Sequence, residues 1–134
     1  MKNLLYLISL VALVSCSSQS FPDKNLYGKH LTVVEMMGTP VQTSGSLNDA
    51  HLIFNSQNGL INGSGGCNRV FGNYTLDKKK SIRFSEIGAT RMACQNMNFE
   101  TRFLNLLEQV RYYEIEDNML LLKDGKKDVV LKLQ

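Results

Sequence analysis

The sequence has few of the residues that build metal centres and covalent active sites. Its 134 residues include three cysteines, two histidines and no tryptophan. No CxxC, HxxxH or HExxH spacing occurs, so no motif places two metal ligands on one structural element. The carboxylates are scattered, and no pair of them indicates the acid and base of a glycosidase. We therefore predict no metal, no cofactor and no catalytic residue.

An excess of positive charge is also lacking. The formal net charge is +3 and is spread along the chain, whereas nucleic-acid-binding domains usually concentrate basic residues on one face. We therefore expect no nucleic-acid partner. Hydrophobic residues make up 43% and charged residues 20%, which is the balance of an ordered globular protein. A chain of this length has room for one domain with one core.

The N-terminus has the features of a targeting segment. Lys2 precedes an apolar run at residues 4–13, which is shorter than the roughly 20 residues that a membrane-spanning helix needs. The run ends in the tetrapeptide LVSC at residues 13–16, which resembles the lipobox of bacterial lipoproteins. We expect residues 1–15 to be a lipoprotein signal peptide and Cys16 to carry the lipid. The alternative is an ordinary secreted protein with a cysteine near its cleavage site.

The residues after Cys16 are polar and aperiodic, and they include Pro22. We expect residues 16–25 to be a lipidated tether and residues 26–134 to be the folded domain. This organisation predicts a membrane-anchored lipoprotein of the bacterial cell envelope, held in the outer membrane and facing the periplasm. The expected partners are the membrane, through Cys16, and an unidentified envelope protein. The protein itself is expected to be a monomer.

Lipidation of Cys16 leaves Cys67 and Cys94 as an even pair in an oxidising compartment, where a disulfide is the default. Closing a loop of about 28 residues would contribute roughly 3–4 kcal/mol to the free energy of unfolding. Two adjacent buried thiols are the alternative. A nucleophilic Cys67, with His30 or His51 as its base, would require a free thiolate.

Short runs of alternating apolar residues, separated by turn signals, predict about seven or eight strands. A single segment has helical spacing, at residues 98–110, with Asn98 as the expected N-cap and Glu100 in the first turn. Strands joined by short turns pair antiparallel, because parallel pairs need long crossovers. The predicted class is α+β, a curved antiparallel sheet or partly open β-barrel with the helix packed on it. The strands are expected near residues 29–37, 51–55, 60–63, 69–76, 82–84, 112–115, 119–123 and 128–133.

The glycine run Gly63, Gly65 and Gly66 could suggest a loop that cradles phosphate. No Lys-Ser/Thr pair follows it and it does not open a helix, so we favour a bend or a close approach between backbones. Arg69 and Arg91 lie near the two cysteines in sequence. They could flank an anionic surface site, although solvated strand ends are the interpretation that we favour.

Three motifs carry a family resemblance: GCN at residues 66–68, GNY at 72–74 and ATRMAC at 89–94. In this order they resemble the META domain of the HslJ-like family, over about residues 26–134. The resemblance implies a small antiparallel, barrel-like α+β fold with one helix, often found on envelope lipoproteins and linked to heat stress. It implies no catalytic residues, because the family has no established active site whose residues could be assigned to this sequence.

The leading hypothesis is a non-enzymatic, lipid-anchored META-domain protein that acts through its surface as an interaction or stress-tolerance module. A second hypothesis is a binding module, with a small ligand, peptide or lipid in the mouth of a partly open barrel. A third is the thiol-dependent enzyme.

Overall fold

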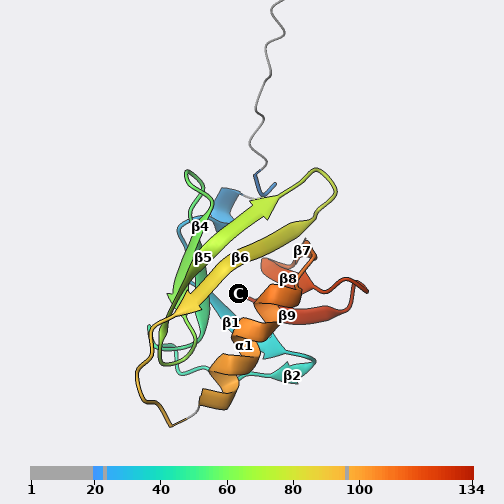
Figure 1. The fold of residues 1–134 in the computed structure, drawn as a ribbon. Coiled ribbons are helices and arrows are strands. Elements are labelled where there is room, and N and C mark those ends of the chain that lie inside the picture. Colours follow the sequence, from blue (N-terminus) through green and yellow to red (C-terminus); the bar gives the residue numbers. More distant parts are fainter. Residues whose placement is uncertain (1–19, 23, 96) are drawn as a thin grey trace, which may run out of the picture.

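The computed structural model describes residues 20–22, 24–95 and 97–134. The predicted signal peptide and lipidated Cys16 lie outside the described residues. Within the described ranges the chain forms nine strands, one short 3-10 helix and one α-helix (Figure 1). The prediction of an α+β fold, with one helix on a curved antiparallel sheet, is confirmed. No helix in the described part of the chain is long and apolar enough to cross a membrane.

Every pairing between two strands is antiparallel, and where the two strands follow one another in the chain this results from their short connection. In chain order they are η1 Lys24–Leu26, β1 Leu31–Met36, β2 Thr39–Pro40, β3 His51–Phe54, β4 Leu60–Ser64, β5 Arg69–Leu76, β6 Ile82–Ala89, α1 Met97–Gln109, β7 Tyr112–Glu116, β8 Met119–Lys123 and β9 Val129–Leu133.

The strands form one sheet in the order β6-β5-β4-β3-β1-β9-β8-β7, with β2 paired to β1. Strands β6 and β7 are the two edges of this sheet. They approach each other at one end, where Ser81 and Tyr112 form an isolated bridge. There the Ile82 amide donates to the Arg111 carbonyl at 3.0 Å. Away from this bridge the edges separate, so the sheet is a partly open barrel.

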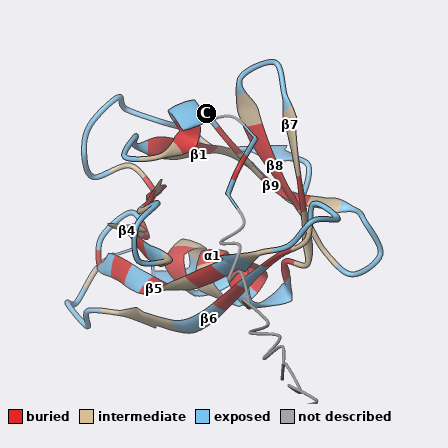
Figure 2. Cartoon of the chain, turned by 90° about the horizontal axis from the view of Figure 1, so that it is seen from above, coloured by how far each residue is buried: buried red, intermediate tan, exposed pale blue. Residues whose placement is uncertain are grey.

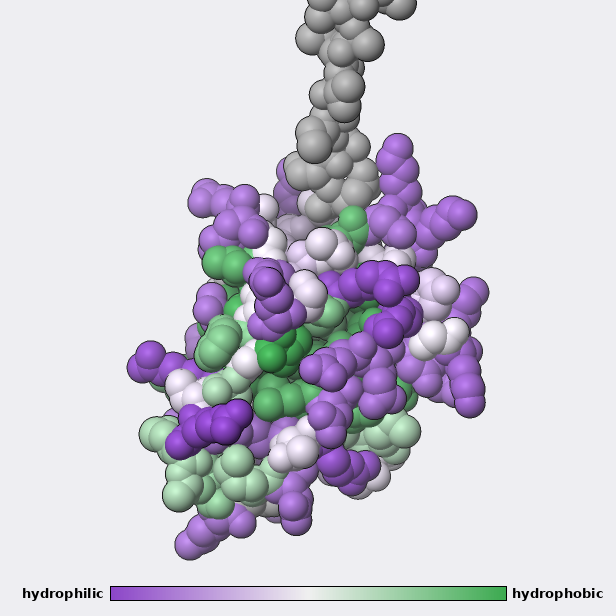
Figure 3. Space-filling view, in the orientation of Figure 1, coloured by the Kyte–Doolittle hydropathy of each residue, from purple (hydrophilic) through white to green (hydrophobic). Residues whose placement is uncertain are grey.

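Helix α1 follows β6 and packs against it. In Figure 3 hydrophobic atoms are visible along the seam between β6 and α1, with hydrophilic atoms around them. Ile87 from β6 and Leu104 from α1 are partly buried and pack on the core. The helix therefore covers the open side of the sheet with its apolar face.

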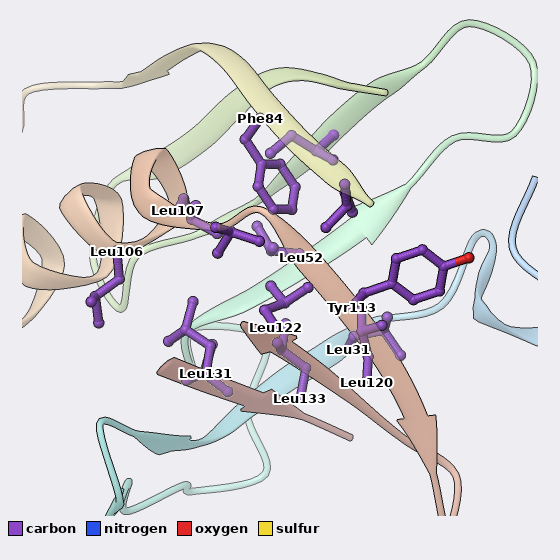
Figure 4. Packing of buried hydrophobic residues seen from close by; sticks show 14 of the residues in the cluster. Leu31, Leu52, Phe84, Leu106, Leu107, Tyr113, Leu120, Leu122, Leu131 and Leu133 are labelled. Atoms are coloured by element: carbon purple, nitrogen blue, oxygen red, sulfur yellow. The ribbon is translucent and has the colours of Figure 1, made fainter. Parts of the chain in front are cut away.

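The helical period correctly predicts which residues of α1 enter the core. Phe103 and Leu107 are fully buried and Leu106 is buried, and Figure 4 shows Leu107 pointing toward Leu52 and Phe84 of the strands. The predicted cap is wrong by one or more residues, because the helix begins at Met97 and Asn98 is already inside it. Glu100 lies in the first turn, as predicted, and its side chain is buried, at 3% exposed.

The interior of the barrel is filled by side chains. Seen from above, β4, β5 and β6 lie on one side and β1, β8 and β9 on the other (Figure 2). The alternation predicted for Arg69–Leu76 is confirmed, since Val70, Gly72 and Tyr74 are buried and Phe71 is exposed. The fully buried strand residues include Val33, Leu52, Phe54, Leu120, Leu122, Leu131 and Leu133.

The folded domain starts earlier in the chain than residue 26. Phe21, which falls in the predicted tether, is 1% exposed. Its ring packs edge-on against Phe54 at 5.2 Å and Tyr113 at 5.0 Å between centroids. Its amide donates to the Tyr27 hydroxyl at 2.8 Å. Because the residues around Phe21 are polar, the sequence did not indicate that Phe21 closes this end of the barrel.

The second hypothesis placed a ligand in the mouth of a partly open barrel. At the end that Phe21 closes, the packing of side chains gives this hypothesis no support.

Candidate functional site

The two cysteine segments meet at one end of the sheet. Cys67 and Cys94 are joined by a disulfide, with their Cα atoms 6.4 Å apart and their positions separated by 27 in the sequence. Cys67 lies in the loop between β4 and β5, and Cys94 lies between β6 and α1. The bond therefore ties the loop before β5 to the segment that leads into the helix. With its sulfur bonded, Cys67 is not the free thiolate that a thiol enzyme needs.

We expect reduction of this disulfide to lower the free energy of unfolding by about 3 kcal/mol, because the unfolded chain regains the freedom of the closed loop. Urea unfolding with and without a reductant measures the difference. The double variant Cys67→Ser/Cys94→Ser is the control and should show the same loss with no further response to reductant. Two reactive thiols at these positions in non-reduced protein would contradict the prediction.

Next to the disulfide, Asn68 and Glu100 form a buried polar pair. The backbone amide of Asn68 donates a hydrogen bond to Glu100 Oε2 at 2.8 Å, and the side-chain nitrogen Nδ2 of Asn68 donates one to Glu100 Oε1 at 2.8 Å. Asn68 Oδ1 accepts from the Met92 amide at 2.7 Å and from the Thr90 hydroxyl at 3.1 Å. One asparagine thus connects the GCN motif, the ATRMAC segment and the helix, so these motifs hold the fold together.

Two glycines allow neighbouring parts of the chain to approach closely at this end of the sheet. A Cβ at Gly63 would lie 2.0 Å from the His51 carbonyl oxygen, and a Cβ at Gly65 would lie 2.5 Å from Glu100 Cγ. Real Cβ atoms do not approach other atoms so closely, so both positions require glycine. Close packing, the interpretation that we favoured over a phosphate loop, is confirmed for Gly63 and Gly65, whereas Gly66 has no such close neighbour and adopts a φ of 99°.

The fold brings together the two histidines, which are 21 positions apart in the sequence. His30 directly precedes β1 and His51 begins β3, and their ring centroids are 4.4 Å apart with 35° between the ring planes. His30 is exposed, whereas His51 is 7% exposed. His51 Nδ1 lies 2.8 Å from the Asp49 carbonyl oxygen. Sequence spacing alone could not predict this pair, because it depends on the register between β1 and β3.

A loop covers the histidine pair, and Asp49 holds it in place. The Asp49 carboxylate accepts hydrogen bonds from the Ser44 amide and hydroxyl and from the Gly45 amide, at 2.8–3.1 Å. These bonds, first those from the Ser44 side chain, lower the pKa of Asp49 below its usual value. The pocket beneath this loop has a volume of about 330 Å³. Its lining includes both histidines, Thr32, Ser46, Asp49 and Gln134.

A larger groove, of about 460 Å³, lies between the start of α1 and the segment that follows β1. The groove combines apolar and polar residues, and Arg102 makes no ion pair with any described residue. Its lining is Met36, Thr39, Pro40, Val41, Gln42, Thr43, Asn48, Asp49, Ala50, Gly66, Phe99 and Arg102.

The other predicted candidates are placed as follows. Arg69 and Arg91 are both exposed, which agrees with solvated positions. Among residues 20–22, 24–95 and 97–134, no group of three or more His, Cys, Asp or Glu side chains could hold a metal ion. Asn68, Glu100 and Phe21 were not predicted as key residues. Each of these buried residues had one signal in the sequence. Asn68 follows a cysteine, Glu100 lies within the apolar face of the helix, and Phe21 is a lone phenylalanine in a polar segment.

Comparisons with known proteins agree with the fold. One solved protein, an NMR structure, aligns with a TM-score of 0.63 and 21% identity, over 82% of this chain and 91% of that chain. An NMR structure of a protein from Burkholderia xenovorans aligns with a TM-score of 0.61 and 21% identity, over 88% of this chain and 93% of that chain.

A crystal structure of a DUF4847 family protein from Bacteroides vulgatus aligns less completely. Its TM-score is 0.50 at 20% identity, over 64% of this chain and 58% of that chain. At these identities the likeness concerns the fold alone. The comparison with curated proteins gives no match. The META domain family model, in contrast, matches residues 24–134. The GCN and ATRMAC motifs, joined through Asn68 and the disulfide, lie inside that match, and the chain belongs to the META domain family.

Proposed function

We propose that this chain is a lipid-anchored META-domain protein of the cell envelope, without catalytic activity, that binds a protein partner on its surface. The LVSC tetrapeptide supports lipidation at Cys16. Burial of Phe21 then leaves four residues between the anchor and the core, so the Cα atoms of Cys16 and Phe21 are at most about 17 Å apart. A lipidated protein would therefore lie close to the membrane, with the Phe21 end of the barrel toward the lipid.

The observation that carries the proposal is the groove beside Phe99 and Arg102. Figure 1 places the described N-terminal residues at one end of the molecule, and β2 and the start of α1 at the other. The groove is lined from both β2 and the first turns of α1. An anchored protein would thus turn this groove away from the membrane, where another envelope protein can reach it.

The lining indicates the chemistry of the partner. Met36, Val41 and Phe99 offer apolar surface, and a volume of about 460 Å³ falls in the range of pockets that take a few side chains. Arg102 is exposed and free of ion pairs within the described residues, and guanidinium groups bind carboxylates in a fork geometry. The occupant that fits is a peptide segment with an apolar side chain beside a carboxylate.

Lipidation is tested by growing cells that express the full chain with radioactive palmitate. We expect label on the wild-type protein and none on Cys16→Ala. Labelling of both variants, or of neither, would contradict the anchor.

The groove is tested by photo-crosslinking in living cells, with the crosslinking residue placed at Gln42 in the groove or at Arg83 on β6, away from it. One envelope protein should be captured from Gln42 and not from Arg83. When Arg102→Glu is combined with the crosslinking residue at Gln42, the amount of captured partner should fall at least about tenfold. The substitution replaces a charge that attracts the partner's carboxylate by one that repels it. Equal capture from both sites, or no effect of Arg102→Glu, would exclude the groove as the binding site.

The absence of catalytic activity is tested separately. An enzymatic turnover of the purified protein that is lost in Cys67→Ser would exclude the non-enzymatic assignment.

A further inference from the structure

A second site lies beside the groove, with which it shares the lining residues Thr43 and Asp49: the pocket that holds His30 and His51. Both side chains leave the outer face of the sheet, since Thr32 is the partner of His51 in the register and His30 lies two residues before Thr32. Diagonal neighbours of this kind on antiparallel strands are within side-chain reach. The 4.4 Å between ring centroids places the two imidazoles against each other at the pocket wall.

The hydrogen bond of His51 defines its protonation pattern. The Asp49 carbonyl oxygen can only accept, so Nδ1, at 2.8 Å, carries the proton that it donates. In a neutral ring Nε2 then holds a free lone pair. No described residue bonds to Nε2, although His51 is more than nine-tenths buried. No side-chain nitrogen or oxygen in the described ranges is both fully buried and unpaired, so this Nε2 must be reachable from the pocket.

A histidine whose Nδ1–H is held by a backbone carbonyl, with Nε2 free, is oriented in the way that metal-binding histidines are. The Asp49 carboxylate holds the Ser44–Gly45 turn, so the residue that orients His51 is itself fixed by the loop. His30 makes no hydrogen bond within the described residues and can turn either ring nitrogen toward His51. Two imidazoles beside an open pocket leave further positions for water, and imidazole suits copper, zinc and nickel.

We propose that His30 and His51 bind a divalent late transition-metal ion, with Cu²⁺ the tightest. His51 coordinates through Nε2 and keeps its Nδ1–H bond to Asp49. His30 supplies the second nitrogen, and water completes the coordination. The metal site is a two-histidine surface site, and for that reason it has none of the sequence spacings that mark preformed metal centres.

The test uses the full chain without an affinity tag and with Cys16→Ala, which removes a competing thiol. One equivalent of Cu²⁺ is added, and pulsed electron paramagnetic resonance counts the imidazoles bound to it. The chain contains only two histidines, so two coordinated imidazoles can come only from His30 and His51. Titration calorimetry measures the affinity of the same sample.

We expect one Cu²⁺ per chain with two imidazoles. His30→Gln and His51→Gln should each leave one imidazole and weaken binding roughly tenfold or more, and the double variant should show no imidazole signal. His30 is exposed, so His30→Gln keeps the fold and remains informative if His51→Gln unfolds. Asp49→Asn, which keeps the backbone carbonyl and loosens the loop, should weaken binding without changing the imidazole count. A wild-type spectrum with fewer than two imidazoles, or an affinity unchanged in His30→Gln, would overturn the proposal.

Discussion

Replacing Phe21 by alanine should lower the free energy of unfolding by about 3–5 kcal/mol, the usual cost of removing a buried aromatic ring. The ring is 1% exposed and contacts Phe54, Tyr74 and Tyr113. Alanine would leave a cavity that three aromatic rings cannot fill without moving. For a domain whose total stability is typically about 5–15 kcal/mol, this is a large fraction.

Phe71→Ala is the matched control. Phe71 is 49% exposed on the outer face of β5, so its loss should cost about 1 kcal/mol or less. Urea unfolding of the two variants, followed by circular dichroism, measures both values. Equal effects at the two positions would contradict the assignment of Phe21 to the core. Equal effects would also mean that the tether extends to residue 25, as the sequence predicted, so that the domain could lie farther from the membrane.

The second large effect is expected for Asn68→Ala, at about 2–3 kcal/mol, the range for a buried polar group that loses a hydrogen-bond partner. The substitution removes the Nδ2 donor to Glu100, which is 3% exposed. It also removes the acceptor of the Met92 amide, but Met92 is 56% exposed, so water can replace that acceptor and this loss should add little. The loss should appear in equilibrium unfolding with the disulfide intact.

Asn62→Ala, at an exposed position of β4, is the control and should change stability by less than about 0.5 kcal/mol. A double-mutant cycle gives a sharper test. Removing Glu100 as well as Asn68 should cost less than the two single losses added together, because the buried carboxyl group disappears with its hydrogen-bond partner. Additive losses would mean that the pair is not coupled.

Local patterns predicted a large part of this fold. The alternation along Arg69–Leu76 identified the buried face of β5, and the spacing of Phe103, Leu106 and Leu107 identified the core face of α1. Both predictions succeed because strand and helix periods are set by neighbouring residues of the backbone. The error at Asn98, the predicted N-cap, occurs where a helix end depends on residues outside the helix.

The candidate sites were far less predictable. Asn68 and Glu100 are 32 positions apart, and His30 meets His51 only through the register of β1 with β3. Each was noticed in the sequence as a single residue. Their chemistry arises from pairing, and pairing depends on how the strands assemble.

The sequence by itself determined the family, the α+β class, the single helix and every strand except β2, although β6 runs farther than predicted, because these follow from motifs and from periodicity along the chain. Tertiary structure alone decided that Phe21 belongs to the core, that Glu100 is buried against Asn68 and that two histidines share a pocket. The physical reason is that burial and proximity are properties of the assembled sheet. A residue acquires its neighbours only when strands distant in sequence come into register.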